Sequence, residues 1–114
     1  MKHEVCSEEE IGPGQHIASE AGGVKFLLFR LDDGYYATQS NCTHLFLPLK
    51  RGKIIDGCKI QCPFHRARFD IRSGEVAEWA NFPPGIQLVN TIRKEKALET
   101  YPVSVENGKI MVEI

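Results

Sequence analysis

Two short stretches of the sequence each hold one cysteine and one histidine. Residues 41–44 read NCTH and residues 61–65 read QCPFH, which pairs Cys42 with His44 and Cys62 with His65. The spacing is C-x-H, then seventeen residues, then C-x-x-H. Thiolate and imidazole together are ligands for zinc and for iron–sulfur clusters. The four side chains therefore predict a metal centre, provided that the fold brings the two stretches together.

The spacing bears on which metal is bound. Zinc sites usually pair like ligands, as C-x₂₋₄-C and H-x₃₋₅-H, whereas each stretch here is mixed and its members are close together. One tetrahedral ion would need both ligands of each tight loop on the same atom. A two-iron cluster relaxes this demand, because each loop can give its cysteine to one iron and its histidine to the other, as in a Rieske centre. Zinc in the same four ligands is the alternative.

The elements that must position these residues are expected to be β-strands. Helical periodicity is nearly absent, and short apolar runs alternate with turn signals, which favours an antiparallel sandwich or barrel. Strands are expected over residues 3–6, 16–20, 24–31, 35–40, 66–71, 100–105 and 109–114, with two short apolar pieces within 53–62.

Turns complete this pattern. Hairpins are expected at 32–34 (Asp-Asp-Gly) and at 106–108 (Glu-Asn-Gly), because Asn-Gly and Asp-Gly between alternating runs are strong hairpin signals. Each Cys-His pair follows a strand and lies in a loop, so the two loops can face each other at the tips of paired strands. The segment 79–99 is compatible with a short helix or with a strand and a basic excursion.

Composition excludes several classes of protein. The chain has 114 residues, 42% of them hydrophobic and 25% charged, which is typical of one globular domain that needs no disulfides. A net charge of −1 provides no positive field to attract nucleic acid. No apolar run is long enough to span a bilayer, and the N-terminus has no secretory signal. We expect a cytoplasmic monomer with no membrane contact.

The flanking sequence resembles a known family. The stretches CTH and CPFH, the RFDIRSGEV that follows, PLKRG at 48–52 and YPVSVENGKIMV near the end are similar to Rieske-type [2Fe–2S] ferredoxins of bacterial oxygenase systems. The resemblance covers nearly the whole chain. It implies one Rieske (ISP-like) domain over 1–114, with a small cluster-binding subdomain at about 42–71 and one cluster per chain. Cys42 and Cys62 would bind the buried iron, and His44 and His65 the outer iron.

The resemblance also predicts the redox potential. High-potential Rieske proteins carry a disulfide beside the cluster and hydroxyl groups against its sulfurs. The matching positions here hold Leu47, Phe64, Ala67 and Phe69. Since features that raise the potential are missing together, we expect the low end of the Rieske range, roughly −150 mV.

The implied function is electron transfer, without catalysis by this chain. A Rieske oxygenase needs a second iron held by two histidines and a carboxylate, but only His3 and His16 remain once the cluster is bound. The family implies transfer from a flavoprotein reductase to a terminal oxygenase, with docking at the His44/His65 tip. A small Rieske subunit of a nitrite-reductase-type complex and a zinc-binding interaction module are the alternatives.

Basic residues cluster around the expected docking tip. They are Lys50, Arg51, Lys53, Arg66 and Arg68. An apolar tip with a basic rim would suit a partner with an acidic rim. The alternative is that these charges are simply solvated.

Overall fold

The computed structural model describes residues 2–41, 48–63, 67–78 and 97–114. Its strands are β1 (Lys2–Ser7), β2 (His16–Ala21), β3 (Val24–Leu31), β4 (Gly34–Gln39), β5 (Lys53–Ile55), β6 (Lys59–Gln61), β7 (Arg68–Asp70), β8 (Val76–Glu78), β9 (Thr100–Tyr101), β10 (Val103–Glu106) and β11 (Lys109–Glu113). One 3₁₀-helix, η1 (Glu8–Glu10), follows β1. Pairing between the described strands is antiparallel throughout, which confirms the all-β prediction.

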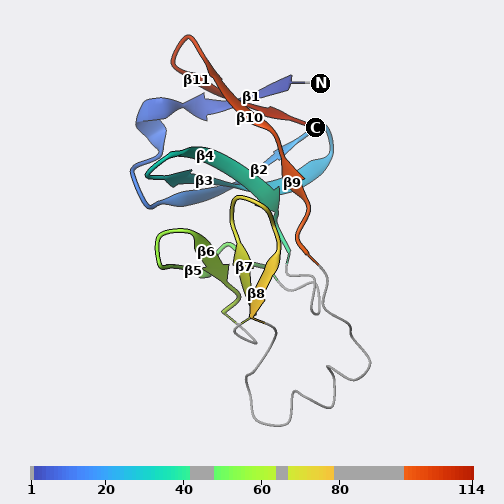
Figure 1. Cartoon of the computed structure of the whole chain (residues 1–114). Helices are drawn as coiled ribbons and strands as arrows, with labels where there is room; N and C mark the ends of the chain where they lie inside the picture. Colours follow the sequence, from blue (N-terminus) through green and yellow to red (C-terminus); the bar gives the residue numbers. More distant parts are fainter. Residues whose placement is uncertain (1, 42–47, 64–66, 79–96) are drawn as a thin grey trace.

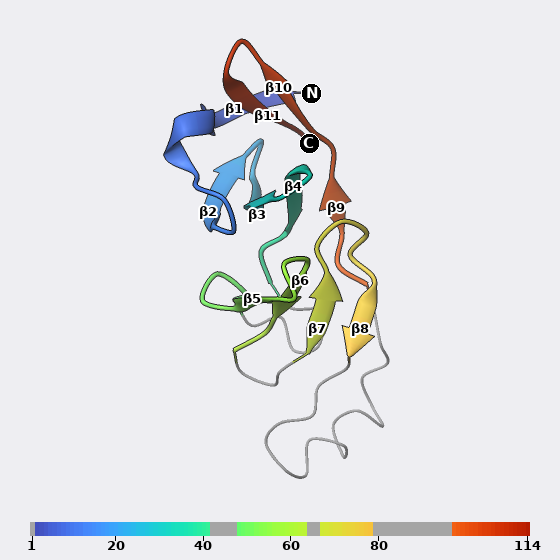
Figure 2. The ribbon, with the colours of Figure 1, turned by 60° about the vertical axis from the view of Figure 1, so that its left-hand side comes forward.

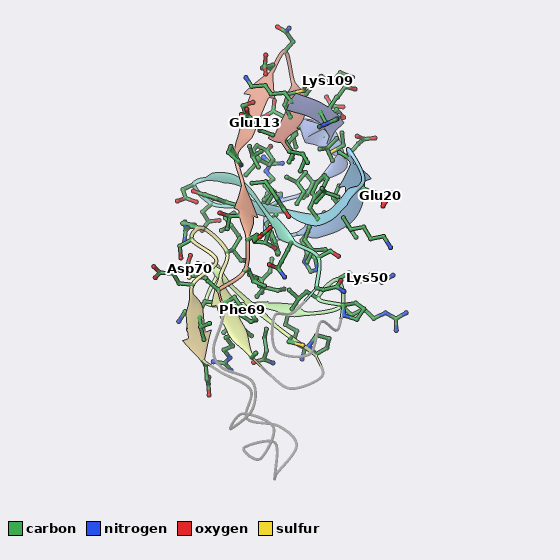
Figure 3. All side chains as sticks on the ribbon, turned by 90° about the vertical axis from the view of Figure 1, so that its right-hand side faces the viewer. Glu20, Lys50, Phe69, Asp70, Lys109 and Glu113 are labelled. Carbon is green, nitrogen blue, oxygen red and sulfur yellow. The ribbon has the colours of Figure 1, made fainter. Side chains whose placement is uncertain are left out.

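The described strands form three sheets. Their orders are β1-β11-β10, β2-β3-β4-β9 and β5-β6-β7-β8. Figures 1 and 2 both show the β2-β3-β4-β9 sheet in the middle, with the other two sheets on opposite sides of it. In Figure 3, Lys109 on β11 and Phe69 on β7 mark these two opposite sides. We call the three the end sheet (β1, β10, β11), the middle sheet and the loop sheet (β5–β8).

Strand β3 explains why the middle sheet is covered on both faces. Successive side chains of a strand point to opposite faces. Phe26 and Leu28 belong to one buried cluster, whereas Leu27, Phe29 and Leu31 belong to another. A nearly continuous apolar run is the pattern expected of a strand that is buried on both sides. The sequence VKFLLFRL therefore serves two cores.

The first core lies between the middle sheet and the end sheet. Besides the two β3 side chains, its buried members are Ile11, Ala37, Ile110 and Val112. The hairpin that joins β10 to β11 turns at Asn107 and Gly108, whose φ angles are 53° and 75°. Positive φ at both central positions is the hairpin geometry that an Asn-Gly pair favours. The predicted hairpin is thus confirmed.

The second core lies between the middle sheet and the loop sheet. Its buried members beyond β3 are Leu49, Ile60, Cys62, Ala67, Phe69, Ile71 and Leu98. One of the four predicted metal ligands, Cys62, is therefore part of this core. The apolar side chains of the loop sheet face the middle sheet. The end of β6 therefore lies against packed side chains.

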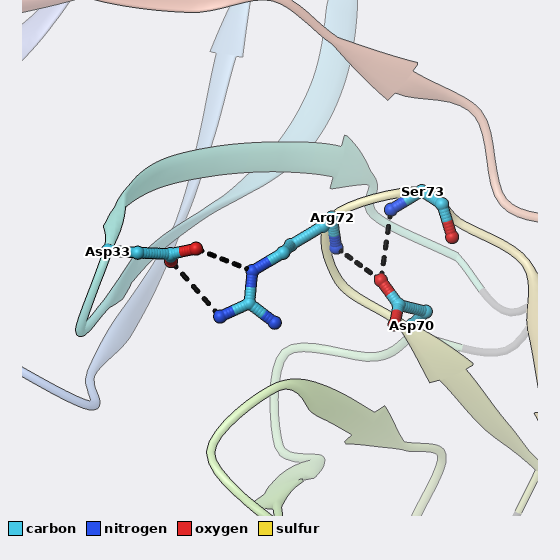
Figure 4. Close-up of polar contacts among 4 residues, drawn as sticks. All are labelled: Asp33, Asp70, Arg72 and Ser73. Carbon is cyan, nitrogen blue, oxygen red and sulfur yellow. Dashed lines mark hydrogen bonds and ion pairs between the residues drawn. The ribbon is translucent and has the colours of Figure 1, made fainter.

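A salt bridge joins the middle sheet to the loop sheet. Arg72, in the turn after β7, donates from Nε and Nη2 to the carboxylate of Asp33 over 2.9 and 3.0 Å (Figure 4). Asp33 lies in the predicted β3–β4 hairpin, which Leu31 and Gly34 close. The hydrogen bonds from Arg72 hold the pKa of the Asp33 carboxyl below its usual value. Both side chains remain partly exposed to solvent.

The turn that carries Arg72 is itself fixed by hydrogen bonds. Oδ1 of Asp70 accepts from the backbone N–H groups of Arg72 and Ser73 over 2.8 and 3.0 Å (Figure 4). A side chain that satisfies backbone donors two and three residues on is a usual role of aspartate in turns. The guanidinium also lies 5.6 Å from the centre of the Tyr36 ring. The salt bridge to Asp33 is therefore presented by an ordered turn.

Two strand predictions differ from the structure. The expected strand 100–105 is two strands: β9 pairs with β4 in the middle sheet, while β10 pairs with β11 in the end sheet. Pro102 separates them, and because proline has no N–H to donate, the chain can change sheets there. Strand β8 was not predicted, because its sequence VAE is short and mostly exposed.

Other predictions fall partly outside the described residues. Residues 79–96 of the segment 79–99 lie outside them, so its assignment stays open. The division into one domain with a cluster-binding subdomain over 42–71 stays a prediction. Among the described residues, no helix is long and apolar enough to cross a membrane.

Candidate metal centre

Cys62 is the predicted ligand that the structure describes. It directly follows β6, and its side chain is completely buried. Its backbone N–H donates to the carbonyl oxygen of Ala67 over 2.8 Å, which pairs the two ends of the second Cys-His stretch. The other three predicted ligands lie outside the described residues: Cys42, His44 and His65.

The ends of the first Cys-His stretch are also paired. Asn41 and Pro48 form an isolated antiparallel bridge, and the N–H of Leu49 donates to the carbonyl oxygen of Ser40 over 2.9 Å. The described residues on either side of the first stretch therefore lie next to each other. Leu49 is buried in the second core together with Cys62. Both stretches are thus anchored at one core, as the predicted site requires.

Gly52 couples the anchor points of the two stretches. Its N–H donates to the carbonyl oxygen of Leu49 over 2.7 Å, which closes a turn after the first stretch. A Cβ at this position would lie 2.9 Å from the Leu49 carbonyl oxygen and would collide with that of Gln61. Gln61 is the last residue of β6 before Cys62, so only a glycine lets this turn pack so closely against β6.

His16 holds the same turn from the middle sheet. Its Nε2 lies 2.8 Å from the carbonyl oxygen of Lys50, and its ring stacks on Phe29 with 5.4 Å between ring centres. His16 is half-buried and links β2 to the turn after the first stretch. No local sequence signal distinguishes this role, because the hydrogen bond joins residues 34 positions apart.

Cys6 and Cys58 are the other cysteines that the structure describes. Cys6 packs against the first core, on the other side of the middle sheet, and its burial raises the pKa of its thiol. Cys58 is half-buried in the turn before β6. Within the described parts of the chain, no group of three or more His, Cys, Asp or Glu side chains could hold a metal ion.

The surroundings of Cys62 fit an iron–sulfur cluster. Its neighbours in the second core include Ala67 and Phe69, both completely buried and neither carrying a hydroxyl group. A buried thiolate is costly unless a cation compensates its charge, and an iron supplies that charge. Because Leu49, shortly after the first stretch, shares this core with Cys62 and Ala67, the cysteine and histidine donors suit one shared centre.

Comparison with known proteins identifies the family. Residues 1–102 match the model of the Rieske [2Fe-2S] domain. The chain belongs to this family. A Rieske-type [2Fe–2S] cluster is accordingly its cofactor.

Its relatives among characterised proteins share one kind of name. The Rieske chain is 29% identical over 108 residues to the biphenyl dioxygenase ferredoxin subunit of Pseudomonas sp. strain KKS102, which covers 95% of this chain and 87% of the relative. It is 27% identical to the ferredoxin component of the naphthalene 1,2-dioxygenase/salicylate 5-hydroxylase systems of Ralstonia sp., over 93% and 88% of the two chains.

Solved structures support the same family. The ferredoxin of carbazole 1,9a-dioxygenase from Nocardioides aromaticivorans IC177 superposes with a TM-score of 0.79 at 25% identity, over 97% of this chain and 95% of that one. A chain of the complex of reduced oxygenase and oxidized ferredoxin in carbazole 1,9a-dioxygenase gives 0.77 at 28% identity, over 97% and 100%. The predicted Rieske fold is thereby confirmed.

Proposed function

We propose that this Rieske protein is a cytoplasmic electron carrier that takes one electron from a flavoprotein reductase and passes it to a terminal oxygenase. The observation that carries the proposal is the C-x-H and C-x-x-H pair within a chain that matches the Rieske domain over residues 1–102. Two relatives that match this chain over most of their own length are ferredoxin components of dioxygenase systems. One solved relative is a complex of oxygenase and ferredoxin.

The ligands we propose are Cys42, His44, Cys62 and His65. The cluster supplies a reversible one-electron step. The chain supplies its placement: Cys62 is held in the second core, and the backbone pairs at Cys62–Ala67 and Asn41–Pro48 hold the ends of the two ligand stretches. Transfer between partners would occur at the end of the molecule that carries the histidines.

We further propose a low reduction potential. Ala67 and Phe69 are buried beside Cys62 and have no hydroxyl that could donate to a cluster sulfur. Hydrogen bonds to the sulfurs stabilise the more negative, reduced cluster, so their absence lowers the potential. A potential near the low end of the Rieske range, roughly −150 mV, suits a carrier that accepts electrons from a flavin.

The test is a spectroscopic and analytical measurement on the purified protein. Ultraviolet–visible and electron paramagnetic resonance (EPR) spectra would be recorded before and after dithionite, with iron and sulfide counts. We expect a red-brown protein with equal iron and sulfide and an average g value below that of all-cysteine clusters. A colourless protein that holds zinc, and that iron and sulfide cannot reconstitute, would overturn the proposal in favour of an interaction module.

The partners need a second measurement. Turnover with a separable flavoprotein reductase and oxygenase, without a lasting complex, is the expected result. Co-purification in a permanent complex with a nitrite-reductase-type enzyme would contradict the carrier and favour the subunit alternative.

A further inference from the structure

One face of the loop sheet carries a row of polar side chains. In the sheet register Lys53 lies opposite Gln61, Gln61 opposite Arg68, and Arg68 opposite Glu78. Residues directly opposite each other in antiparallel strands share a face. The neighbouring row faces the second core and holds Ile54, Ile60, Phe69 and Val76. The polar row therefore faces away from that core.

Within this row a neutral amide separates two cations. Nε of Arg68 donates to Oε1 of Gln61 over 2.7 Å, while Lys53 is on the other side of Gln61. The amide orients the guanidinium and leaves its charge in place. Arg68 also lies 3.6 Å from Glu78, at the outer edge of the sheet. Lys53 is exposed and has no ion pair with any described residue.

These side chains surround a cavity beside the predicted metal centre. Arg51, Lys53, Gln61, Pro63 and Arg68 line a surface cavity of about 350 Å³. Its lining residues Gln61 and Pro63 are the two chain neighbours of Cys62. Arg51 is exposed and, like Lys53, makes no ion pair with the described part of the chain.

The backbone that presents Arg51 and Lys53 is fixed. Gly52 lies between them, and its close contact with the carbonyl oxygens of Leu49 and Gln61 presses this turn against β6. A fixed backbone reduces the entropy that is lost when a partner binds. The positive charges are thus concentrated around one hollow.

Two residues earlier on β6, the same face carries a cation with acidic neighbours. There Lys59 lies opposite Asp70, and its Nζ is 3.8 Å from the carboxylate of Asp56. Lys59 and Arg68 therefore each have an acidic neighbour, whereas Arg51 and Lys53 have none among the described residues. This unpaired charge lies beside the Cys62 end of β6.

We propose that the cavity receives an Asp or Glu carboxylate from the docking surface of a redox-partner protein. The inference rests on the proposed electron-transfer function and specifies the chemistry of the partner. Guanidinium groups bind carboxylates with two parallel hydrogen bonds, and lysine adds a third donor. Since the net charge of the chain is only −1, the attraction is local and acts within the Debye length of roughly 8–10 Å at physiological ionic strength.

Three variants of the holoprotein separate this proposal from general charge effects. Arg51→Gln with Lys53→Gln removes two cations. Gln61→Glu keeps all the cations but places a carboxylate of nearly the same shape among them, as a bound partner would. Lys59→Gln removes one positive charge from the same sheet face, where it is already paired, and is the matched control.

The first experiment measures, in a stopped-flow instrument, the rate at which each reduced holoprotein is oxidised by two substitution-inert one-electron oxidants. Hexacyanoferrate(III) is anionic and tris(phenanthroline)cobalt(III) is cationic. For the double variant and for Gln61→Glu at low ionic strength, we expect the anionic reagent to react roughly 3- to 10-fold more slowly and the cationic reagent to react faster. Lys59→Gln should change either rate less than about twofold. Equal changes in the control, or none in the other variants, would overturn the proposal.

The two reagents also exclude an effect of driving force. Gln61 neighbours a predicted ligand, so its substitution can shift the reduction potential. A shift in potential moves both rates in the same direction, whereas a change in the charge of the cavity moves them in opposite directions. Rates that rise or fall together would therefore count against the cavity.

The second experiment uses an acidic peptide as the probe. A fluorescent, acetylated tetraglutamate peptide is titrated with each oxidised holoprotein, and anisotropy is recorded. We expect weak, salt-sensitive binding to the wild type and to Lys59→Gln, and none to the other two variants. Binding that persists in Gln61→Glu would refute a carboxylate site. Tighter binding of a short oligonucleotide of equal charge would assign the cavity to nucleic acid instead.

Failure of this inference can be distinguished from failure of the proposed function. Iron, sulfide and the EPR spectrum are measured for every variant. A wild type without the cluster would refute the electron carrier. If the wild type holds the cluster but the variants at Arg51, Lys53 and Gln61 are oxidised at the same rates as the wild type, only the cavity proposal is refuted.

Discussion

The two cores on either side of β3 are enclosed in different ways. The strands of the end sheet have six, four and five residues, whereas each strand of the loop sheet has three. Short strands make few ladder hydrogen bonds and rarely persist alone. The end sheet is therefore held by its own pairing and by the first core. The loop sheet depends more on contacts from outside it: the Gly52 turn and the Asp33–Arg72 pair.

This difference indicates which sheet is less stable because it carries the ligand loops. Ligand loops need irregular backbone, and irregular backbone weakens the sheet that bears it. The less stable sheet, β5–β8, lies on only one side of the middle sheet. The opposite side retains the longer strands, including the Asn107–Gly108 hairpin.

Removing one ligand should separate the two sides most sharply. Cys62→Ala is expected to abolish the cluster, since a thiolate ligand of one iron is lost. Iron and sulfide analysis would fall to background, while circular dichroism would retain the β signal of the end and middle sheets. Retention of full iron and sulfide would refute Cys62 as a ligand. Cys6→Ala is the control, because Cys6 packs against the first core.

Truncation in the first core should destabilise the whole molecule. Phe26→Ala removes a completely buried ring and is expected to lower the free energy of unfolding by about 3–5 kcal/mol. Chemical denaturation of the apoprotein measures this loss without the cofactor. A loss under about 1 kcal/mol would mean that the first core does not carry the stability assigned to it.

A smaller change should act on the loop sheet alone. Gly52→Ala would force a Cβ against the carbonyl oxygens of Leu49 and Gln61, at an expected cost of about 1–3 kcal/mol. Hydrogen exchange should show faster opening of β5 and β6, with the end sheet unaffected. Gly57→Ala is the control: its φ is 70° and no atom lies within 4 Å, so only backbone strain of about 1 kcal/mol is expected. Equal effects from the two variants would argue against the Gly52 contact.

The smallest effect is expected at the junction of the two regions. Arg72 lowers the pKa of Asp33 in the folded protein. The pair therefore stabilises the fold at pH values above the pKa of Asp33 in the unfolded chain, which is near 3.8. This contribution is lost as the pH falls through the lower folded pKa. The stability difference between wild type and Asp33→Asn should therefore be present at neutral pH and vanish under strongly acidic conditions. A difference that does not change with pH would contradict the assignment, and urea titrations at both pH values would measure it.

Much of the fold could be predicted because it is local. The apolar runs of β1 to β4 and the turn residues at Asp33-Gly34 and Asn107-Gly108 encode strands and hairpins within a few residues. The assignment of Cys42, His44, Cys62 and His65 as ligands stays a prediction, which rests on their chemically restrictive spacing. The predicted range of β3, 24–31, agrees with the structure at both ends.

What could not be predicted depends on distant partners. The pairing of Ala37 with Tyr101 brings together residues from opposite halves of the chain. The hydrogen bond from His16 to Lys50 and the contact of Gly52 with Gln61 likewise arise only after the sheets have packed. The sequence indicates the basic residues Arg51, Lys53 and Arg68 but gives no sign of Gln61, because an amide between two cations is defined only by the sheet register.

The first and last strands, β1 and β11, pair with each other in the end sheet, where Lys2 lies opposite Glu113. Figure 1 shows N and C together, on the far side of the middle sheet from β5–β8. An affinity tag, a fused domain or a linker to an electrode can therefore be attached at either terminus without covering the loop sheet or the proposed docking cavity. Immobilised in this way, every molecule would face solution with the same side, and its current could be compared directly with that of a freely diffusing protein.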